Sequence, residues 1–215
     1  MTPGTDVMAT IRETRVVAIL RASGAERFRE IAFALFEAGI PVVEFTFSSQ
    51  GALEALREFV AEAPADLVLG AGTVLDEQAA AAAVKAGARF LVTPGAVPEV
   101  MTVGRHAGVP VLPGALTASE VLQAWRTGAA AVKVFPASLG GPDYIAALRA
   151  PLPQIPLVPT GGVTIEAAAS YLEAGAVAVG MGAPLIGDAA AGGSLDGLRE
   201  RAGALVAAVR RAGGG

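Results

Sequence analysis

The chain has 215 residues, a formal net charge of −4, and 53% hydrophobic and 17% charged residues. This length suits one domain with a sizeable core, and the acidic balance argues against a nucleic-acid-binding protein, which normally carries clustered Lys and Arg. There is no cysteine and a single histidine, His106, which excludes disulfides, thiolate nucleophiles and metal sites built from Cys or clustered His. We expect His106 to be a solvated residue at a helix end, and we expect neither a metal nor a cofactor.

The apolar runs are too short for a membrane protein. Runs such as VVAIL have the length of a strand, whereas a spanning helix needs about 18 or more apolar residues. Residues 1–14 lack the apolar core of a signal peptide and are expected to form an N-terminal extension or helix. Residues 212–215 are expected to be a disordered tail with nothing to bury. We therefore expect a cytoplasmic protein with no membrane partner.

A helix-to-strand pattern recurs along the chain, in which a glycine closes a helical segment and a β-rich run follows. Glycine just past a helix end is favoured for a left-handed cap, and a strand can follow after a short loop. These glycines are Gly39, Gly87, Gly108, Gly128 and Gly175. Their spacing indicates a unit of about 20 to 24 residues, with two signals missing.

Filling the gaps predicts eight strands separated by helical segments. In chain order they are 16–20, 42–47, 67–72, 90–95, 110–114, 130–135, 156–161 and 177–182. Asp76 is a predicted helix N-cap, and Thr117 with Glu120 has the spacing of a capping box. Strands that alternate with helices form parallel βαβ units, so the chain predicts an α/β fold, a single-domain (β/α)8 TIM barrel over residues 1–215. A doubly wound open sheet is the alternative.

Two charged residues lie within strands that are otherwise apolar. Side chains alternate along a strand, so Glu44 faces the barrel interior while Phe45 faces the helices. The same alternation turns Lys133 inward and Val132 outward. Alternate strands contribute to common interior layers, and the active site of a barrel lies at the C-terminal ends of its strands. We therefore expect Glu44 and Lys133 to approach each other across the barrel mouth.

Two interpretations of this pair stay open. The structural one is a buried ion pair, in which either partner alone would be costly. The functional one is a nucleophilic amine with a carboxylate base. An amine attacks a carbonyl only when neutral, a form favoured by desolvation and by a nearby cation such as Arg21, and opposed by Glu44. Only two of the 16 cationic residues are lysine, which favours the functional interpretation, because an electrostatic role was open to arginine too.

The stretch VPTGGVTIEAA predicts a phosphate site. It runs from a strand through Gly161 and Gly162 into an expected helix with Thr164 as N-cap. Glycines let the backbone approach a ligand closely, and a helix N-terminus favours an anion. In barrels, phosphate usually binds at the loops after strands seven and eight, which here carry TGG and GMGAP. A simple tight turn is the structural alternative.

Together these segments resemble the bacterial 2-keto-3-deoxy-6-phosphogluconate (KDPG) aldolase family, the class I aldolases of the Entner–Doudoroff pathway. The resemblance rests on VVEFTF, GAGTVLDEQ, FLVTPG, VPVLPGALTASE, AVKVFPA and VPTGGV, in family order and spacing, and covers the chain from about residue 16 to the last helix. It implies a TIM barrel, typically a homotrimer, that acts on a small 2-keto acid, releases pyruvate and an aldehyde, and needs no cofactor.

The resemblance also implies roles for particular residues. It places the Schiff-base lysine at Lys133 and the general acid/base glutamate at Glu44. It places contacts to the pyruvate carboxylate at Thr73, around Pro94 and at Arg21. The remaining substrate-binding residues, most of them in the phosphate turns, are Thr160, Gly161, Gly162, Gly182 and Ala183.

Two residues depart from the family pattern. Ser48 stands where many members have an arginine that assists the carboxylate, so Arg21 alone would have that role. Ala183 stands where members often place a serine in the final phosphate turn, which admits a shorter or unphosphorylated 2-keto acid.

The implied reaction is the reversible cleavage of KDPG to pyruvate and glyceraldehyde 3-phosphate through an imine at Lys133. The same chemistry on 2-keto-3-deoxy-6-phosphogalactonate (KDPGal) or 4-hydroxy-2-oxoglutarate is an alternative. So are a phosphate-binding barrel enzyme that forms no imine, and a non-enzymatic trimeric barrel that serves for binding or assembly.

Overall fold

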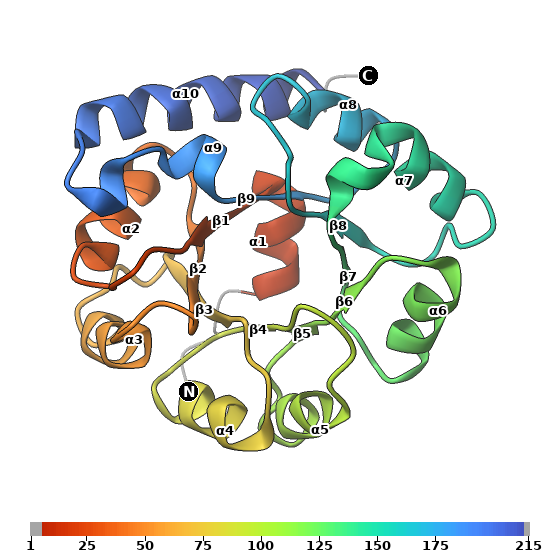
Figure 1. Cartoon of the computed structure of the whole chain (residues 1–215), viewed down its shortest axis with the longest axis horizontal. Coiled ribbons are helices and arrows are strands. Elements are labelled where there is room, and N and C mark those ends of the chain that lie inside the picture. Colours follow the sequence, from red (N-terminus) through yellow and green to blue (C-terminus); the bar gives the residue numbers. More distant parts are fainter. Residues whose placement is uncertain (1–5, 213–215) are drawn as a thin grey trace.

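Parallel strands alternate with helices throughout the computed structural model, which describes residues 6–212. The strands are β1 (Val16–Leu20), β2 (Val42–Thr46), β3 (Val68–Gly72), β4 (Leu91–Val92), β5 (Val111–Leu112), β6 (Gly114–Ala115), β7 (Val132–Val134), β8 (Leu157–Pro159) and β9 (Val179–Met181). The helices are α1 (Val7–Thr14), α2 (Phe28–Glu37), α3 (Ala52–Val60), α4 (Glu77–Lys85), α5 (Pro98–Ala107), α6 (Ala118–Arg126), α7 (Gly141–Arg149), α8 (Ala168–Glu173), α9 (Ala183–Ile186) and α10 (Leu195–Arg211), with 3-10 turns at η1 (Ala137–Leu139) and η2 (Ala189–Ala191). Figure 1 shows the strands as an inner ring with most helices around it.

The strands close into one barrel. Parallel pairing gives two sheets, ordered β5-β4-β3-β2-β1-β9 and β6-β7-β8. A parallel bridge between Thr160 and Gly180 joins the end of β8 to β9. On the other side only Pro113 separates β5 from β6, and proline has no N–H for a ladder hydrogen bond. β5 and β6 are therefore the one predicted strand 110–114, and the (β/α)8 barrel is confirmed over the open sheet.

Several predicted strands are shorter than expected at their C-terminal ends. The prediction 16–20 is reproduced by β1, whereas 90–95 is reduced to β4. The reason lies in the residues after Val92. The Thr93 hydroxyl donates a hydrogen bond to the Gly95 carbonyl at 2.6 Å, and Pro94 offers no donor, so this segment turns away from the ladder. These turns cover the C-terminal end of the barrel, which we call the mouth.

The helix-capping predictions hold at most positions. All five helix-ending glycines have positive φ, from 67° at Gly108 to 97° at Gly87. The Asp76 carboxylate accepts a hydrogen bond from the Ala79 N–H, and Thr117 with Glu120 forms the predicted capping box. His106 lies exposed in the last turn of α5, as expected.

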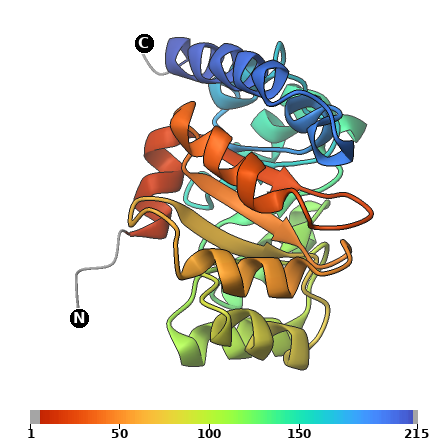
Figure 2. The same cartoon turned by 90° about the vertical axis from the view of Figure 1, so that its left-hand side faces the viewer.

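Apolar residues occupy two layers. The outer layer packs the strands against the surrounding helices. The inner layer fills the barrel with alternate strand residues and the buried face of α1, and it consists of Val7, Met8, Ile11, Val17, Val42, Val68, Phe90, Val92, Leu112, Ala131, Val158 and Ala178. Figures 1 and 2 show α1 at the axis of the ring, at the end where the strands begin. We call this N-terminal end of the strands the closed end.

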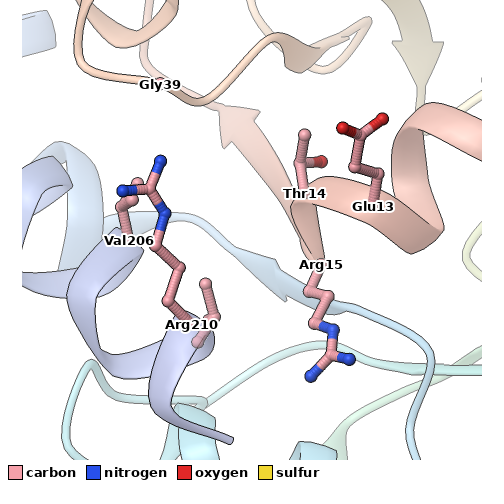
Figure 3. A pocket seen from close by; sticks show the side chains of 7 residues that line it. Glu13, Thr14, Arg15, Gly39, Val206 and Arg210 are labelled. Atoms are coloured by element: carbon pink, nitrogen blue, oxygen red, sulfur yellow. The ribbon is translucent and has the colours of Figure 1, made fainter. Parts of the chain in front are cut away.

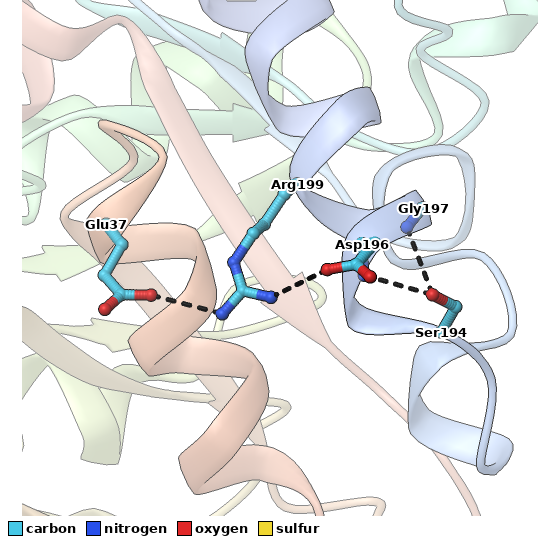
Figure 4. A network of polar contacts seen from close by, with 5 residues as sticks. All are labelled: Glu37, Ser194, Asp196, Gly197 and Arg199. Carbon is cyan, nitrogen blue, oxygen red and sulfur yellow. Dashed lines mark hydrogen bonds and ion pairs between the residues drawn. The ribbon is translucent and has the colours of Figure 1, made fainter.

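Helix α10 is linked to α2 by an ion pair. Ser194 caps α10 by accepting hydrogen bonds from the backbone N–H groups of Asp196 and Gly197. Arg199 bridges Asp196 on its own helix and Glu37 on α2, each at 3.3 Å (Figure 4). The predicted tail 212–215 starts at the C-cap of α10, and residues 213–215 lie outside the described residues, as do residues 1–5 of the predicted N-terminal segment.

Candidate active site

Glu44 and Lys133 both point into the barrel, as the strand alternation predicts. Each lies two residues after a member of the inner apolar layer, Val42 on β2 and Ala131 before β7. Glu44 is 1% exposed and Lys133 is 5% exposed, so both charges are removed from bulk water. Burying such groups is unfavourable unless they are paired, so their surroundings decide what they can do.

The Lys133 amine is not held in an ion pair. Among the described residues, the ion pairs within 4.0 Å are formed by Arg27, Arg29, Arg57 and Arg199, and none includes Lys133. Its Nζ lies 5.3 Å from the centroid of the Phe135 ring, two residues further along the chain. The structural interpretation, a direct ion pair between Glu44 and Lys133, is therefore wrong. The Phe135 ring is the neighbour that the geometry gives to the amine, and the Glu44 carboxyl acts on it only through its charge.

The Glu44 carboxylate has an acceptor that no described residue uses. Its Oε1 is fully buried and has no hydrogen-bond partner. Burial raises the pKa of the Glu44 carboxyl above its ordinary value of 4.5, and the positive charges of Lys133 and Arg21 oppose this effect. Buried polar atoms in folded proteins are nearly always paired, so an open acceptor beside a lysine is a candidate for chemistry.

Arg21 and Thr73 meet at the mouth. The Arg21 Nη2 donates to the Thr73 hydroxyl at 3.4 Å, although 52 positions separate the two in the chain. Thr73 adopts a φ of 57°, which is rare for a residue with a branched side chain and is found mainly at functional sites. The pair offers a guanidinium and a hydroxyl on the same side of the mouth, a combination that suits a carboxylate.

A buried hydroxyl network fixes the loop that carries Arg21, and sequence reasoning missed it. The Thr46 hydroxyl donates to the Leu20 carbonyl at 2.8 Å and lies 3.2 Å from the Ser49 hydroxyl. Ser49 in turn accepts a hydrogen bond from the Ala22 N–H at 3.0 Å. The polar run TFSS after β2 was the available signal. Ser48 is exposed beside this network, with its hydroxyl 3.5 Å from that of Thr46.

The glycine turn after β8 lies next to the lysine strand. Gly161 and Gly162 have φ values of 87° and 76°, and the Ser138 N–H donates to the Gly161 carbonyl at 3.0 Å. A Cβ built on Gly161 would lie 2.9 Å from the Phe135 ring. Phe135 thus contacts the lysine on one side and approaches the turn on the other. Thr160, directly before the turn, is buried.

The prediction that a helix begins directly after Thr164 is wrong. Thr164 accepts a hydrogen bond from the Ala167 N–H at 3.3 Å, but the residues between them form a turn and α8 begins only at Ala168. The short hydroxyl closes this turn instead of a helix end. Since no helix N-terminus follows the glycines directly, phosphate binding here would depend on the backbone of Gly161 and Gly162.

The remaining predicted site residues lie at neighbouring strand ends. Gly182 follows β9 and the exposed Ala183 begins α9, next to the end of β8. Pro94 is exposed in the turn after β4, and its carbonyl leaves no room for a Cβ at Gly114. The strand order places all of these at the mouth, but no contact joins Pro94 or Ala183 to Lys133.

A pocket at the closed end is a poorer candidate. It has a volume of about 380 Å³ and is lined by Glu13, Thr14, Arg15, Gly39, Val206, Val209 and Arg210. Figure 3 shows that Arg15 and Arg210 carry their guanidinium groups to different sides. No convergent set of polar groups forms there, whereas the mouth brings a buried amine and a buried carboxyl together.

Two further features of the described residues bear on the kind of protein. No helix among residues 6–212 combines the length and apolar character needed to cross a membrane. Within the same range, no three His, Asp or Glu side chains are grouped so that they could hold a metal ion.

Comparison with known proteins gives a consistent result. Residues 7–193 match the sequence model of the aldolase family described as KDPG and KHG aldolase. The chain is 40% identical to the 2-dehydro-3-deoxy-phosphogluconate aldolase of Pseudomonas aeruginosa, over 75% of this chain and 73% of the relative. It is 35% identical to the 2-dehydro-3-deoxy-6-phosphogalactonate aldolase of Escherichia coli K12, over 92% of this chain and 95% of the relative.

A solved structure adds a chemical observation. A KDPG aldolase from Legionella pneumophila, with pyruvate captured at low pH as a covalent carbinolamine intermediate, superposes with a TM-score of 0.82. It is 29% identical, and the match covers 94% of this chain and 98% of that one.

Proposed function

Because the chain belongs to the KDPG and KHG aldolase family, we propose that it is a class I aldolase that reversibly cleaves KDPG to pyruvate and glyceraldehyde 3-phosphate. The observation that carries the proposal is the buried amine of Lys133, which no carboxylate pairs with directly. It shares the interior of the mouth with the Glu44 Oε1 that has no partner.

Lys133 supplies the nucleophile. Its neutral amine adds to the C2 carbonyl of the 2-keto acid, and the resulting carbinolamine loses water to give a protonated imine. The imine nitrogen then accepts the electron pair that the breaking C3–C4 bond releases. The Phe135 ring lies 5.3 Å from the Lys133 Nζ and borders the amine on one side. We assign Arg21 and Thr73 to the substrate carboxylate.

Glu44 moves the proton. Its carboxylate takes the proton of the C4 hydroxyl as the C3–C4 bond breaks, so the aldehyde leaves and a pyruvate enamine stays on Lys133. The same carboxyl returns the proton to C3, and water hydrolyses the imine to release pyruvate and the amine. A carboxyl whose pKa is raised by burial suits both steps, because acid–base catalysis works best when the pKa lies near the working pH.

Trapping of the imine tests this mechanism. Borohydride reduction in the presence of pyruvate should add one reduced pyruvyl group to Lys133, located by peptide mass spectrometry, and none to Lys85. Absence of the adduct at saturating pyruvate would favour a phosphate-binding enzyme that forms no imine, or a non-enzymatic barrel. Since the mechanism uses no metal or cofactor, dialysis against EDTA should leave the cleavage rate unchanged.

KDPGal is the second candidate substrate, and one observation favours it. The relative named for phosphogalactonate matches 92% of this chain, whereas the Pseudomonas relative named for phosphogluconate matches 75%. The two substrates differ in configuration at C4, whose hydroxyl proton Glu44 would take. Measuring kcat/KM for both epimers, and for 4-hydroxy-2-oxoglutarate, decides between them.

The need for phosphate is a separate question, because Ala183 lacks a hydroxyl. Comparing phosphorylated and unphosphorylated 2-keto-3-deoxy acids measures what the phosphate contributes. If Gly161 and Gly162 bind it through their backbone, KM should be lower for the phosphorylated compound. Equal KM values would assign the glycine pair a purely structural role.

We also propose that the protein is a homotrimer and is located in the cytoplasm. In support of assembly, two large apolar side chains at the mouth are exposed, Leu75 to 56% and Leu139 to 71%. Light scattering coupled to gel filtration tests the trimer, and cell fractionation tests the location. A phosphorylated sugar acid is charged and does not cross membranes unaided, so its aldolase is expected where the substrate is made.

A further inference from the structure

Gly72, at the end of β3, lies against the side chain of Glu44. A Cβ built on Gly72 would lie 2.6 Å from Glu44 Cγ and would overlap its carboxylate carbon and Oε1. Real Cβ atoms do not approach other atoms so closely, so an alanine at this position and the observed Glu44 rotamer exclude each other. The Glu44 carboxylate occupies the space that any side chain at position 72 would take.

The backbone at Gly72 does not require glycine. Its φ lies outside the left-handed region, which Thr73 alone enters at this corner. Gly72 pairs in register with Thr46, and its carbonyl accepts a hydrogen bond from the Phe47 N–H at 2.8 Å. These are ordinary strand interactions that alanine could also make. The need for glycine at this position is therefore a need for space beside Glu44.

Glycines at other inward positions show that this barrel uses the same device elsewhere. A Cβ on Gly70, two residues earlier on β3, would overlap the ring of Phe90. A Cβ on Gly180 would overlap the hydroxyl of Thr160. Each inward glycine thus admits one large or polar side chain from a neighbouring strand. At Gly72 the side chain admitted is the acid–base group.

We infer that Gly72 is a positioning residue for the reaction, which lets the Glu44 carboxylate take its observed position by leaving the space beside β3 free of a side chain. The inference rests on the proposed role of Glu44. It assigns no contact between Gly72 and the substrate. A methyl group at position 72 would push the carboxylate away from the C4 hydroxyl, while Lys133, Arg21 and Thr73 would remain where they are.

The test is a cycle of Gly72→Ala and Glu44→Ala. In the cleavage assay, Gly72→Ala should lower kcat about 100-fold, as expected for a catalytic group displaced by about 1 Å, with KM changed less than about threefold. Added to Glu44→Ala, the same change should alter the residual kcat less than about threefold, because no carboxylate remains to be displaced. An equal loss in both backgrounds, or a wild-type kcat in Gly72→Ala, would overturn the inference.

Thermal unfolding gives a second readout that needs no activity. Gly72→Ala should lower Tm in the wild-type background and not in Glu44→Ala, whereas the control Gly70→Ala should lower Tm equally in both, since it meets Phe90 instead. If Gly72→Ala does not fold, the double variant must fold; failure of both would overturn the inference. A wild-type protein without cleavage would refute the proposed function, and the thermal cycle would then still show whether glycine at position 72 is needed to admit the Glu44 side chain.

Discussion

The mouth and the closed end of the barrel are built from the same strands but differ in what they bury. At the closed end, α1 packs against Val17, Val42 and Val68, and the inner layer is wholly apolar. Towards the mouth, polar side chains replace it. The buried polar side chains of the described residues are Glu44, Thr46, Ser49, Thr93, Lys133 and Thr160.

The difference shows how this fold separates stability from chemistry. Burying a polar group is unfavourable. The buried polar side chains of the described residues lie towards the mouth, so the apolar layer at the closed end stabilises the barrel without that cost. The mouth then carries groups that would weaken the core elsewhere. Substitutions at the two ends should therefore have different consequences, and the following predictions are ordered from the largest expected effect.

Replacing Lys133 should have the largest effect. Lys133→Met has an unbranched side chain of similar length but lacks the amine, so kcat/KM for cleavage should fall by roughly 10,000-fold or more. Lys85→Met, on the exposed end of α4, is the matched control and should retain activity. Comparable losses in both, with circular dichroism unchanged, would mean that the reactive amine has been misassigned.

Replacing the acid–base group should come second. Glu44→Gln keeps the shape but cannot take a proton, so cleavage should slow by roughly 100- to 10,000-fold. The borohydride adduct with pyruvate should still form at Lys133, because the amine is intact. Stopped-flow measurement of aldehyde release checks the rate. A variant that cleaves normally would remove Glu44 from the mechanism.

Replacing Arg21 should mainly affect binding. Arg21→Ala removes a charged hydrogen-bond donor next to Thr73, so KM should rise roughly 10- to 100-fold with a smaller change in kcat. Ser48→Arg, which introduces a guanidinium where the family resemblance implies one, is the complementary variant and should recover part of this loss. If Arg21→Ala leaves KM unchanged, another group binds the carboxylate.

The pH dependence of stability should reveal Glu44 at the mouth. Because burial raises the pKa of Glu44 in the folded state, the native protein binds more protons than the unfolded one above about pH 4.5. Its contribution to stability is therefore greatest at low pH and declines as pH rises through the folded pKa. Over this pH range the free energy of unfolding, measured by urea titration, should therefore rise for Glu44→Gln relative to the wild type. A difference that stays constant with pH would show that Glu44 has no raised pKa.

Substitution at the closed end should have the smallest effect. Arg210→Ala, on the exposed side of the pocket in Figure 3, should change the free energy of unfolding by less than about 0.5 kcal/mol and leave kcat/KM unaltered. A clear loss of activity would show that the two ends are coupled, and the division between them would have to be redrawn.

Most of the framework could be read from local chemistry. Glycine caps, Asp76 and the Thr117–Glu120 box mark helix ends because they satisfy backbone groups within a few residues. Strand alternation placed Glu44 and Lys133 correctly, because the period of two is a property of every strand. Both depend only on neighbours in the sequence.

What could not be predicted depends on contacts between distant segments. The distance between Lys133 and Glu44, and hence the absence of a direct ion pair, follows from how the barrel closes. The open acceptor of Glu44 is likewise invisible in the sequence, and so is the clash that a Cβ at position 72 would make with it, because GAG at the end of β3 shows only that small residues stand there. The start of α8 was misplaced because a threonine hydroxyl can close a turn as well as cap a helix.

The helix α1 also limits how reactants and products enter and leave the barrel. Since it and the inner apolar layer fill one end, reactants and products share a single opening. Pyruvate stays covalently attached while the aldehyde departs, so the aldehyde must leave first, and the water that hydrolyses the imine arrives by the route the aldehyde has vacated. Run in reverse, pyruvate must form the enamine on Lys133 before an aldehyde can react, so we expect an aldehyde that enters the shared opening first to compete with pyruvate.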